Sequence, residues 1–408
     1  EAMTYALNGG PDNTDYHGTV TADRSDGLIQ LRGFGRATLL RDYFPFSRSA
    51  DLFNTERIDF ARGPNSVLFG IGSTGGVVNA TSKQARGDRT LGLAQMRLGS
   101  WDDFRGTIDV NRPITRALAV RVNGVYQERE SWREFEFLKL KGGALSATWQ
   151  PWRNTSLRLQ SEYVDRRQIV AYPWGPVDIV STWLDAGRPI SRNNTAAVAG
   201  TVTSANRYVV FDPTAAQGPV SWFGTRMTTP KATATPASTA QGPGLFRFDL
   251  VPRSVNLMGA GSRGDNHYGN HSAFLEQRAG PFCAEISYNA HRSYRVAHNP
   301  VSTAENGVRA DANELLPSGA PNPNAGRFYV ESNASYTSHN ERFDHLHLTA
   351  SLDLDGRAYH LGRHRLAILG SRERARTDFW FNYEVNTTPA GTSIYPASLI
   401  NVNNRVYR

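Results

Sequence analysis

The chain has 408 residues, of which 39% are apolar, a mean hydropathy of −0.47 and a formal net charge of +8. It contains no run of about 18 apolar residues, which excludes transmembrane helices but not transmembrane strands, because strands need only about ten residues of alternating polarity. The basic residues are spread along the chain and do not form the patch that nucleic-acid binding requires. All but four are arginines, which fits either codon usage or recognition of anionic ligands.

The first 84 residues predict a small α+β unit. Polar residues 1–27 are expected to form loops, and residues 28–34 a short strand that ends in Arg-Gly-Phe. Residues 37–46 predict a second strand and turn, and residues 51–56 a short helix. The following stretch, 56–83, is rich in glycine and ends in a small strand at 77–81, so its glycines indicate tight turns and close packing.

From Thr90 onward the sequence alternates between apolar and polar residues, which predicts sheet with one apolar and one polar face. Ile108 and Val110, for example, alternate with Asp109 and Asn111. The alternation predicts nine strands, near residues 90–98, 103–112, 117–129, 140–150, 155–168, 270–279, 282–296, 341–354 and 363–382.

The connections between these strands favour a membrane barrel over a soluble sandwich. Alternate connections are tight, whereas the third, fifth and seventh have about 10, 100 and 44 residues, the last two near 169–269 and 297–340. Short turns on one rim and long loops on the other are typical of outer-membrane barrels. Nine strands cannot enclose a domain, so we expect a fragment of a barrel of about 22 strands that aggregates or fails to insert when expressed alone.

One stretch closely resembles the end of the plug domain in TonB-dependent outer-membrane receptors. It reads Arg62-Gly63-Pro64-Asn65-Ser66-Val67-Leu68-Phe69-Gly70, and continues with Gly75-Gly76-Val77-Val78-Asn79 and Lys83. The earlier Leu31-Arg32-Gly33-Phe34 is similar to a second plug signature of this family. The sequence of this stretch is most similar to the siderophore-receptor branch, although Gln84-Ala85 stands where that branch often has Arg-Pro.

The resemblance implies a plug that ends near residue 84, followed from 85 to 408 by the first part of a transmembrane barrel. It implies that Arg32 and Arg62 pair with barrel glutamates, which we expect on later strands absent from this chain; alternatively, both arginines cap plug turns. The plug motif would comprise Arg32, Gly33, Phe34, Arg62, Gly63, Pro64, Gly70, Gly75 and Gly76.

The function implied by the resemblance is active uptake across the outer membrane of a Gram-negative-type bacterium. The expected partners are outer-membrane lipid, TonB with ExbB and ExbD as its energy source, and a scarce ligand, for which a ferric siderophore is the first choice. Cobalamin or an oligosaccharide is the alternative ligand. A passive porin-like channel would not need the glycine-rich stretch, and a secreted sugar hydrolase would need paired acids that the sequence does not offer.

The remaining candidate residues carry weaker signals. Aromatic residues of the long fifth connection either contact a ligand or form a small core in the loop; they are Tyr172, Trp174, Trp183 and Trp222. His345 and His347 point to one face, but without a third ligand nearby we predict no metal site. Cys283, the only cysteine, is expected to be an inert small apolar residue. We predict no cofactor and no enzymatic activity.

Overall fold

The computed structural model describes most of the strands and part of the N-terminal region. The described residues are 5–6, 28–29, 38–48, 51–61, 76–169, 177–178, 184, 187–188, 247–257, 259–299, 307–311, 321–331, 334–355, 362–383 and 405–407. No helix in these ranges is long and apolar enough to cross a membrane.

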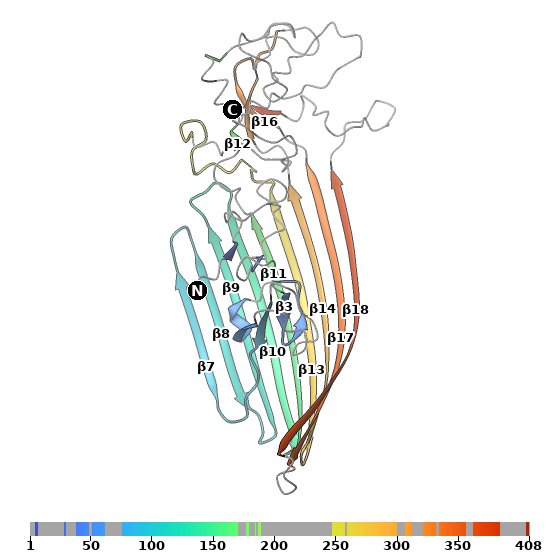
Figure 1. Cartoon of the computed structure of the whole chain (residues 1–408). Helices are drawn as coiled ribbons and strands as arrows, with labels where there is room; N and C mark the ends of the chain where they lie inside the picture. Colours follow the sequence, from blue (N-terminus) through green and yellow to red (C-terminus); the bar gives the residue numbers. More distant parts are fainter. Residues whose placement is uncertain are drawn as a thin grey trace, which may run out of the picture.

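The central element is a curved nine-stranded antiparallel sheet in the order β18-β17-β14-β13-β11-β10-β9-β8-β7 (Figure 1). Each strand pairs with the next long strand of the chain, as an up-and-down barrel wall requires. The strands are β7 (Leu91–Leu98), β8 (Phe104–Pro113), β9 (Leu118–Glu130), β10 (Phe137–Trp152), β11 (Thr155–Ile169), β13 (Arg263–Ala279), β14 (Phe282–Asn299), β17 (Ser335–Asp355) and β18 (Arg363–Tyr383).

These nine strands confirm the predicted ones, with two kinds of difference. β10, β13 and β17 begin three to seven residues earlier than predicted. The added residues of β17, from Ser335 to Asn340, are mostly polar on both faces, so alternation of polarity could not mark them. The third connection is also shorter than expected, because β9 ends at Glu130 and β10 begins at Phe137.

The two faces of the sheet are the reverse of those in a soluble sandwich. We call the face that the N-terminal residues contact the inner face, and the opposite one the outer face. On β14, the outer-face side chain of Ile286 is 50% exposed, whereas Asn289 and His291 on the inner face are fully buried. The same pattern holds on β8, where Ile108 and Val110 are exposed and Asn111 is buried. An exposed apolar face is stable only against lipid or another apolar surface.

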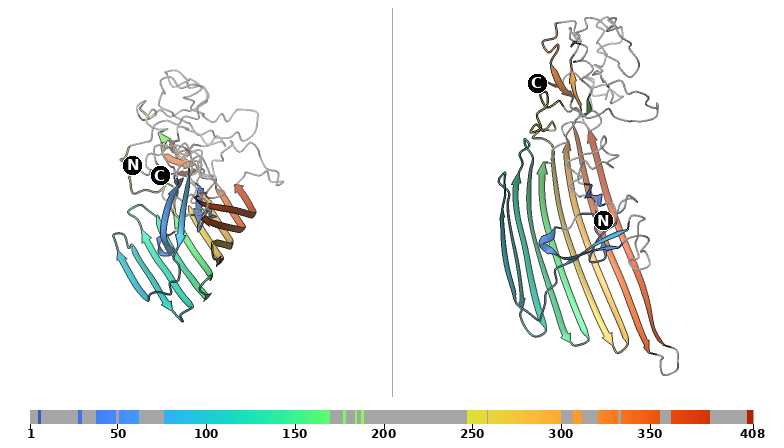
Figure 2. Two further views of the ribbon diagram at one scale, coloured as in Figure 1. Left: turned by 60° about the horizontal axis from the view of Figure 1, so that its bottom comes forward. Right: turned by 60° about the vertical axis from the view of Figure 1, so that its left-hand side comes forward.

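A small N-terminal unit lies on the inner face of the sheet (Figure 2). It consists of β3 (Thr38–Arg41), β4 (Phe44–Pro45), the 3-10 helix η1 (Leu52–Asn54), β5 (Thr55–Ala61) and β6 (Val77–Ser82). Its strands have the order β4-β3-β6-β5, with β3 parallel to β6. A separate pair of short strands, β1 (Tyr5–Ala6) and β2 (Leu28–Ile29), completes the described N-terminal region.

The predicted strand at 77–81 and the strand and turn at 37–46 are present in this unit, but the helix predicted at 51–56 is wrong in type. Only a three-residue 3-10 turn forms, capped by the Asp51 carboxylate, which accepts a hydrogen bond from the Phe53 amide at 2.8 Å. Thr55 then enters β5, because its backbone pairs with Ser82 of β6. The described part of the unit is therefore mainly β and not α+β.

The connections at the end of the sheet opposite the tight turns form a second small sheet. Its strands are β12 (Val177–Asp178), β15 (Gly307–Ala310), β16 (Phe328–Glu331) and β19 (Arg405–Tyr407), in this order. Val308 and Ala310 are buried there, with partly buried Leu184, Leu250, Val251, Leu257 and Phe328 packed against them. The fifth and seventh connections and the segment that follows β18 therefore join in one structured cap, at the top of Figure 1.

We predict that the outer face of the sheet contacts lipid. Leu348, half-exposed on the outer face of β17, should lower the free energy of unfolding in lipid bilayers by about 2–4 kcal/mol when changed to arginine. Chemical denaturation of the whole receptor in vesicles measures this change. The matched control is Thr349→Arg on the inner face, next in sequence, where the added charge meets a cavity that Glu276 and Glu285 also line. Equal losses from both substitutions would contradict a lipid-facing outer surface.

Candidate functional site: the contact between the N-terminal unit and the sheet

The first contact is an ion pair between Arg41 of β3 and Glu162 of β11. The Arg41 Nη2 atom lies 2.5 Å from Glu162 Oε2, and both side chains are almost fully buried. Glu162 also accepts hydrogen bonds from the Asn54 side-chain amide and, at 2.7 Å, from the Tyr268 hydroxyl of β13. Glu162 thus has a partner for each oxygen, as a buried carboxylate requires.

Arg41 is also fixed from within its own unit. Its guanidinium donates to the Thr55 hydroxyl at 3.0 Å and to the Asn54 carbonyl at 2.9 Å. Burial by itself disfavours the charged form, but Glu162 and then Asp42 outweigh it, so the pKa of Arg41 lies above its usual value. Burial raises the pKa of the neighbouring Asp42 despite Arg41 and the hydrogen bonds from Ser82. Arg41 therefore approaches the sheet as a permanent, oriented cation.

The second contact joins residues 47 and 48 to β14 and β17. The Arg48 guanidinium lies 2.8 Å from the Glu341 carboxylate and donates to the Ser293 hydroxyl at 2.9 Å. The Ser47 hydroxyl donates to the same Glu341 oxygen at 2.8 Å and lies 3.1 Å from the His291 ring. Arg41 and Arg48, seven positions apart, are therefore held by different strands of the sheet, β11 in one case and β14 with β17 in the other.

The third contact is a paired hydrogen bond between Asp51 and Arg105 of β8. The two nitrogens of the guanidinium lie 2.5 Å and 3.2 Å from the two carboxylate oxygens, the two-point geometry that arginine favours. Arg105 also donates to Gln127 of β9 at 2.8 Å. Because Asp51 caps η1 as well, this pair fixes the turn that presents Phe53 and Asn54 to the sheet.

An apolar contact lies between these ion pairs. Phe46 and Phe53 of the unit share a buried cluster with five residues of the sheet, namely Val125, Leu140, Ala144, Val164 and Tyr268. Gly142 of β10 leaves room for the Phe53 ring, because a Cβ atom there would lie 2.9 Å from Val125 and 3.1 Å from Phe53. A patch of apolar residues on an otherwise polar inner face thus marks where the unit docks.

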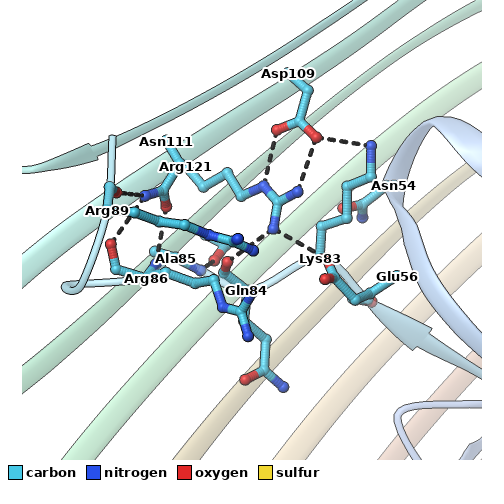
Figure 3. Close-up of polar contacts among 12 residues, drawn as sticks. Asn54, Glu56, Lys83, Gln84, Ala85, Arg86, Arg89, Asp109, Asn111 and Arg121 are labelled. Carbon is cyan, nitrogen blue, oxygen red and sulfur yellow. Dashed lines mark hydrogen bonds and ion pairs between the residues drawn. The ribbon is translucent and has the colours of Figure 1, made fainter. Parts of the chain in front are cut away.

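A fourth group of contacts fixes residues 83–89, which lead from β6 into β7 (Figure 3). Arg121 of β9 binds both oxygens of Asp109 at 2.8 Å and reaches Glu56 at 3.0 Å, while Lys83 lies 2.9 Å from Asp109. The Asn111 side chain accepts from the Arg86 amide at 2.8 Å and donates to the Arg89 carbonyl at 2.6 Å. This segment is bound to the wall along its length.

A cavity of about 770 Å³ separates the N-terminal unit from the tight-turn end of the sheet. Asp42, Tyr43 and Phe44 line it on one side, and strands β11 to β18 on the other. Cys283 lines it too, half-buried in the polar inner row of β14 and not among the apolar outer residues. His345 and His347 occupy the predicted inner face, and the His347 ring lies 4.6 Å from that of Phe44. Among the described residues no cluster of three metal-ligating side chains is present.

Most of the candidate residues chosen from sequence lie outside the described part of the chain. They are Arg32, Gly33, Phe34, Arg62, Gly63, Pro64, Gly70, Gly75, Tyr172, Trp174, Trp183 and Trp222. Gly76 is described, and its φ of 91° is in the region that favours glycine. Arg32 and Arg62 therefore keep their predicted roles as predictions.

Sequence reasoning missed the arginines and carboxylates that make the contact. The main ones are Arg41, Arg48, Asp51, Arg105, Arg121 and Glu162. Partner glutamates for Arg41 and Arg48 lie on strands of this chain. One sequence signal could have indicated these contacts, namely a carboxylate at an inner-face position of a strand, as at Glu162. A carboxylate buried inside a barrel needs a cation as its partner.

A sheet with an apolar outer face and a separate unit bound to its polar inner face is the architecture of a plugged barrel receptor. No family model matches the chain. It is similar to the metal-pseudopaline receptor CntO of Pseudomonas aeruginosa, at 32% identity over 126 residues, covering 30% of this chain and 18% of that receptor. It is also similar to the probable TonB-dependent receptor BfrD of Bordetella pertussis, at 38% identity over 84 residues, covering 21% of this chain and 11% of that protein.

The fold is that of the ferripyoverdine receptor of the outer membrane of Pseudomonas aeruginosa, solved with ferripyoverdine bound. The two agree with a TM-score of 0.58 at 13% identity, over 95% of this chain and 42% of that one. These findings confirm the predicted resemblance to TonB-dependent receptors of the siderophore-receptor type. The chain spans about two fifths of that receptor's length, and its alignments cover less than a fifth of the curated relatives.

We predict that Glu162→Gln loosens the N-terminal unit. The change removes the ion-pair partner of the buried Arg41 guanidinium on the sheet, so docking should lose about 3–5 kcal/mol. Hydrogen exchange of amides in residues 38–61 of the whole receptor measures the loss. The control is Glu285→Gln, whose partner Arg158 is part-exposed on the same sheet, with an expected change below about 1 kcal/mol. Equal exchange in both variants would refute the role of the Arg41 pair.

A second prediction concerns the space left by Gly142. Gly142→Ala should displace the Phe53 ring and cost about 1–3 kcal/mol of docking free energy, because the added methyl group has no room. The neighbouring Gly143→Ala is the matched control, since its added methyl group would meet nothing within 4 Å. Faster exchange of the Phe53 amide in the first variant alone is the expected result, and unchanged exchange would show that Phe53 does not need this space.

Proposed function

We propose that the chain is part of a TonB-dependent outer-membrane receptor that imports a ferric siderophore or a related metal chelate. The observation that carries the proposal is the set of buried and part-buried ion pairs that holds the N-terminal unit against the inner face of an outwardly apolar sheet. A passive porin would have no use for a unit that fills its lumen. The similar proteins include a metal-pseudopaline receptor and a probable TonB-dependent receptor, which supports the choice of ligand and energy source.

The order of the contacts along the chain suggests how the plug would detach from the sheet under a pulling force. Residues 41 and 54 meet Glu162 of β11, residue 48 meets Glu341 of β17 and residue 51 meets Arg105 of β8. A force applied from the N-terminal side would therefore break contacts at three places on the sheet one after another. Breaking polar contacts in sequence requires less force than breaking them together. Residues 83–89 carry their own contacts to β8–β10 and would hold the rest of the chain in place.

The cavity of about 770 Å³ below Asp42 and Phe44 gives such a movement a direction. Displacing the β3–β4 hairpin would connect this cavity with the space on the other side of the N-terminal unit, toward the long connections. In this proposal TonB, energised by ExbB and ExbD, supplies the pull, and the receptor spans the outer membrane with its structured cap outside. In this proposal the receptor releases its ligand and does not convert it chemically. We therefore propose no catalysis and no resident cofactor.

Binding of ligands to the whole receptor tests the proposal. Ferric siderophores should quench its tryptophan fluorescence at micromolar concentration, whereas cobalamin and oligosaccharides should not. Ligand-dependent uptake of radioactive iron should stop in cells that lack TonB. Quenching by cobalamin or an oligosaccharide alone would replace the ligand class and keep the transport mechanism. Steady ion conductance in planar bilayers without ligand or TonB would favour the porin-like alternative.

A further inference from the structure

One histidine of the sheet lies directly at the contact with the N-terminal unit. His291, on the inner face of β14, is fully buried. The centroid of its ring lies 4.8 Å from that of Phe46 in the unit and 5.9 Å from that of Phe343 in β17. Its Nε2 atom lies 3.1 Å from the Ser47 hydroxyl, whereas its buried Nδ1 atom has no hydrogen-bond partner among the described residues. The two ring nitrogens therefore differ in their surroundings.

The hydrogen bonds around Ser47 decide which of these nitrogens carries the proton. The Ser47 hydroxyl has a single proton, which it donates to the Oε2 atom of Glu341 at 2.8 Å. An ionised carboxylate only accepts hydrogen bonds, so this bond cannot run in the opposite direction. The Ser47 oxygen then accepts from His291, and the Nε2 atom is the protonated one. His291, Ser47 and Glu341 thus form a chain of two hydrogen bonds directed toward the carboxylate.

The carboxylate at the end of this chain is the one that holds Arg48. The Oε2 atom of Glu341 accepts from the Arg48 guanidinium at 2.8 Å, so Ser47 and Arg48 donate to the same oxygen. Hydrogen bonds that follow one another in one direction polarise and strengthen each other. The position of the Glu341 oxygen, and with it the contact to Arg48, therefore depends on the donor at His291.

A second proton on His291 would oppose this arrangement. An imidazolium would place an unbonded N–H group and a positive charge in a buried space between aromatic rings, which is costly. Charged or titratable groups lie near the ring on several elements, and they are Arg48 of the unit, Tyr268 of β13, Arg292 of β14, and Glu341 and His345 of β17, the last 3.9 Å from Glu373 of β18. Glu341 already binds Arg48. The docked contact is therefore compatible with the neutral imidazole and not with the imidazolium.

We propose that His291 is a positioning residue for the contact between Arg48 and Glu341, and that it makes this contact weaker in acid. Through Ser47 the neutral imidazole orients Glu341 toward Arg48. When the unit moves away, His291 would meet water, in which a histidine ordinarily takes up its second proton at about pH 6.5.

The sign of the pH dependence follows from which state binds this proton. Only the undocked state takes it up, so docking has its full strength above about pH 6.5 and weakens by about tenfold for each pH unit below that value. The inference rests on the proposed function, since the pull on the N-terminal unit would have to break this contact.

Hydrogen exchange of the amides of residues 44–48 in the whole receptor tests the proposal. After correction for the intrinsic effect of pH on exchange, their protection should fall about 10-fold from pH 7.5 to pH 5.5. In His291→Gln the amide keeps a donor near the Nε2 position but cannot become a cation, so protection should stay within about twofold at both pH values. In His291→Leu no donor remains, so protection should be about fivefold lower at pH 7.5, as the loss of one hydrogen bond predicts.

The matched control is His271→Gln, on the outer face of β13. The His271 ring lies 2.9 Å from the Ser161 hydroxyl, so it is also bonded to a serine, but on the face opposite to the N-terminal unit. This variant should keep the fall of about 10-fold. The proposal is overturned if His291→Gln keeps the fall as well, or if His291→Leu is protected as strongly as the unchanged receptor at pH 7.5.

Two further measurements separate the role of His291 from folding and from transport. Nitrogen-15 NMR of labelled histidines, with the His291 signal assigned by its loss in His291→Gln, should show a neutral ring protonated at Nε2 at pH 7.5; protonation at Nδ1 would overturn the proposal. Unaltered quenching by ferric siderophores shows that the variants are folded. Normal TonB-dependent uptake without the pH effect would refute the role of His291 only, whereas the pH effect without chelate uptake would refute the proposed function only.

Discussion

Buried charge on the inner face of the sheet is the constraint on which the rest of the structure depends. A strand that turns its apolar side chains outward must turn its polar ones inward, and Glu162, Asp109 and Arg121 are buried there. Each of these groups loses hydration that only an opposite charge or a hydrogen bond replaces. The N-terminal unit supplies these partners through Arg41, Asn54 and Lys83, so plug and wall satisfy each other.

The contacts between the N-terminal unit and the sheet fall into two groups that differ in how easily they would break. Arg41, Arg48 and Asp51 bind distant strands through short polar contacts that a displacement of a few ångströms would break. Residues 83–89 bind β8–β10 through backbone and side chain together, and they continue into the wall. In the proposed opening, the first group of contacts would break and the second group would keep the N-terminal unit attached to the sheet.

The residues of the outer surface change in character along the strands. The apolar rows of β14, β17 and β18 give way to arginines at one end only, the end that carries the long connections. The tight-turn end has no comparable outer cluster on these three strands among the described residues. This polarity orients the sheet independently of loop length.

The sequence by itself determined the strands, their order and their faces, because side-chain alternation with a period of two is a local property. It also indicated the plug-like region, through the resemblance of residues 62–83 to the end of the plug domain in TonB-dependent receptors. It could not determine that Arg41 meets Glu162, 121 residues away, because that contact depends on how β3 docks against a finished sheet. Nor could it separate the 3-10 turn at Leu52–Asn54 from a helix, since backbone pairing of Thr55 with β6 ends the turn. Tertiary structure decided which buried charges are partners, because burial and distance exist only in the folded chain.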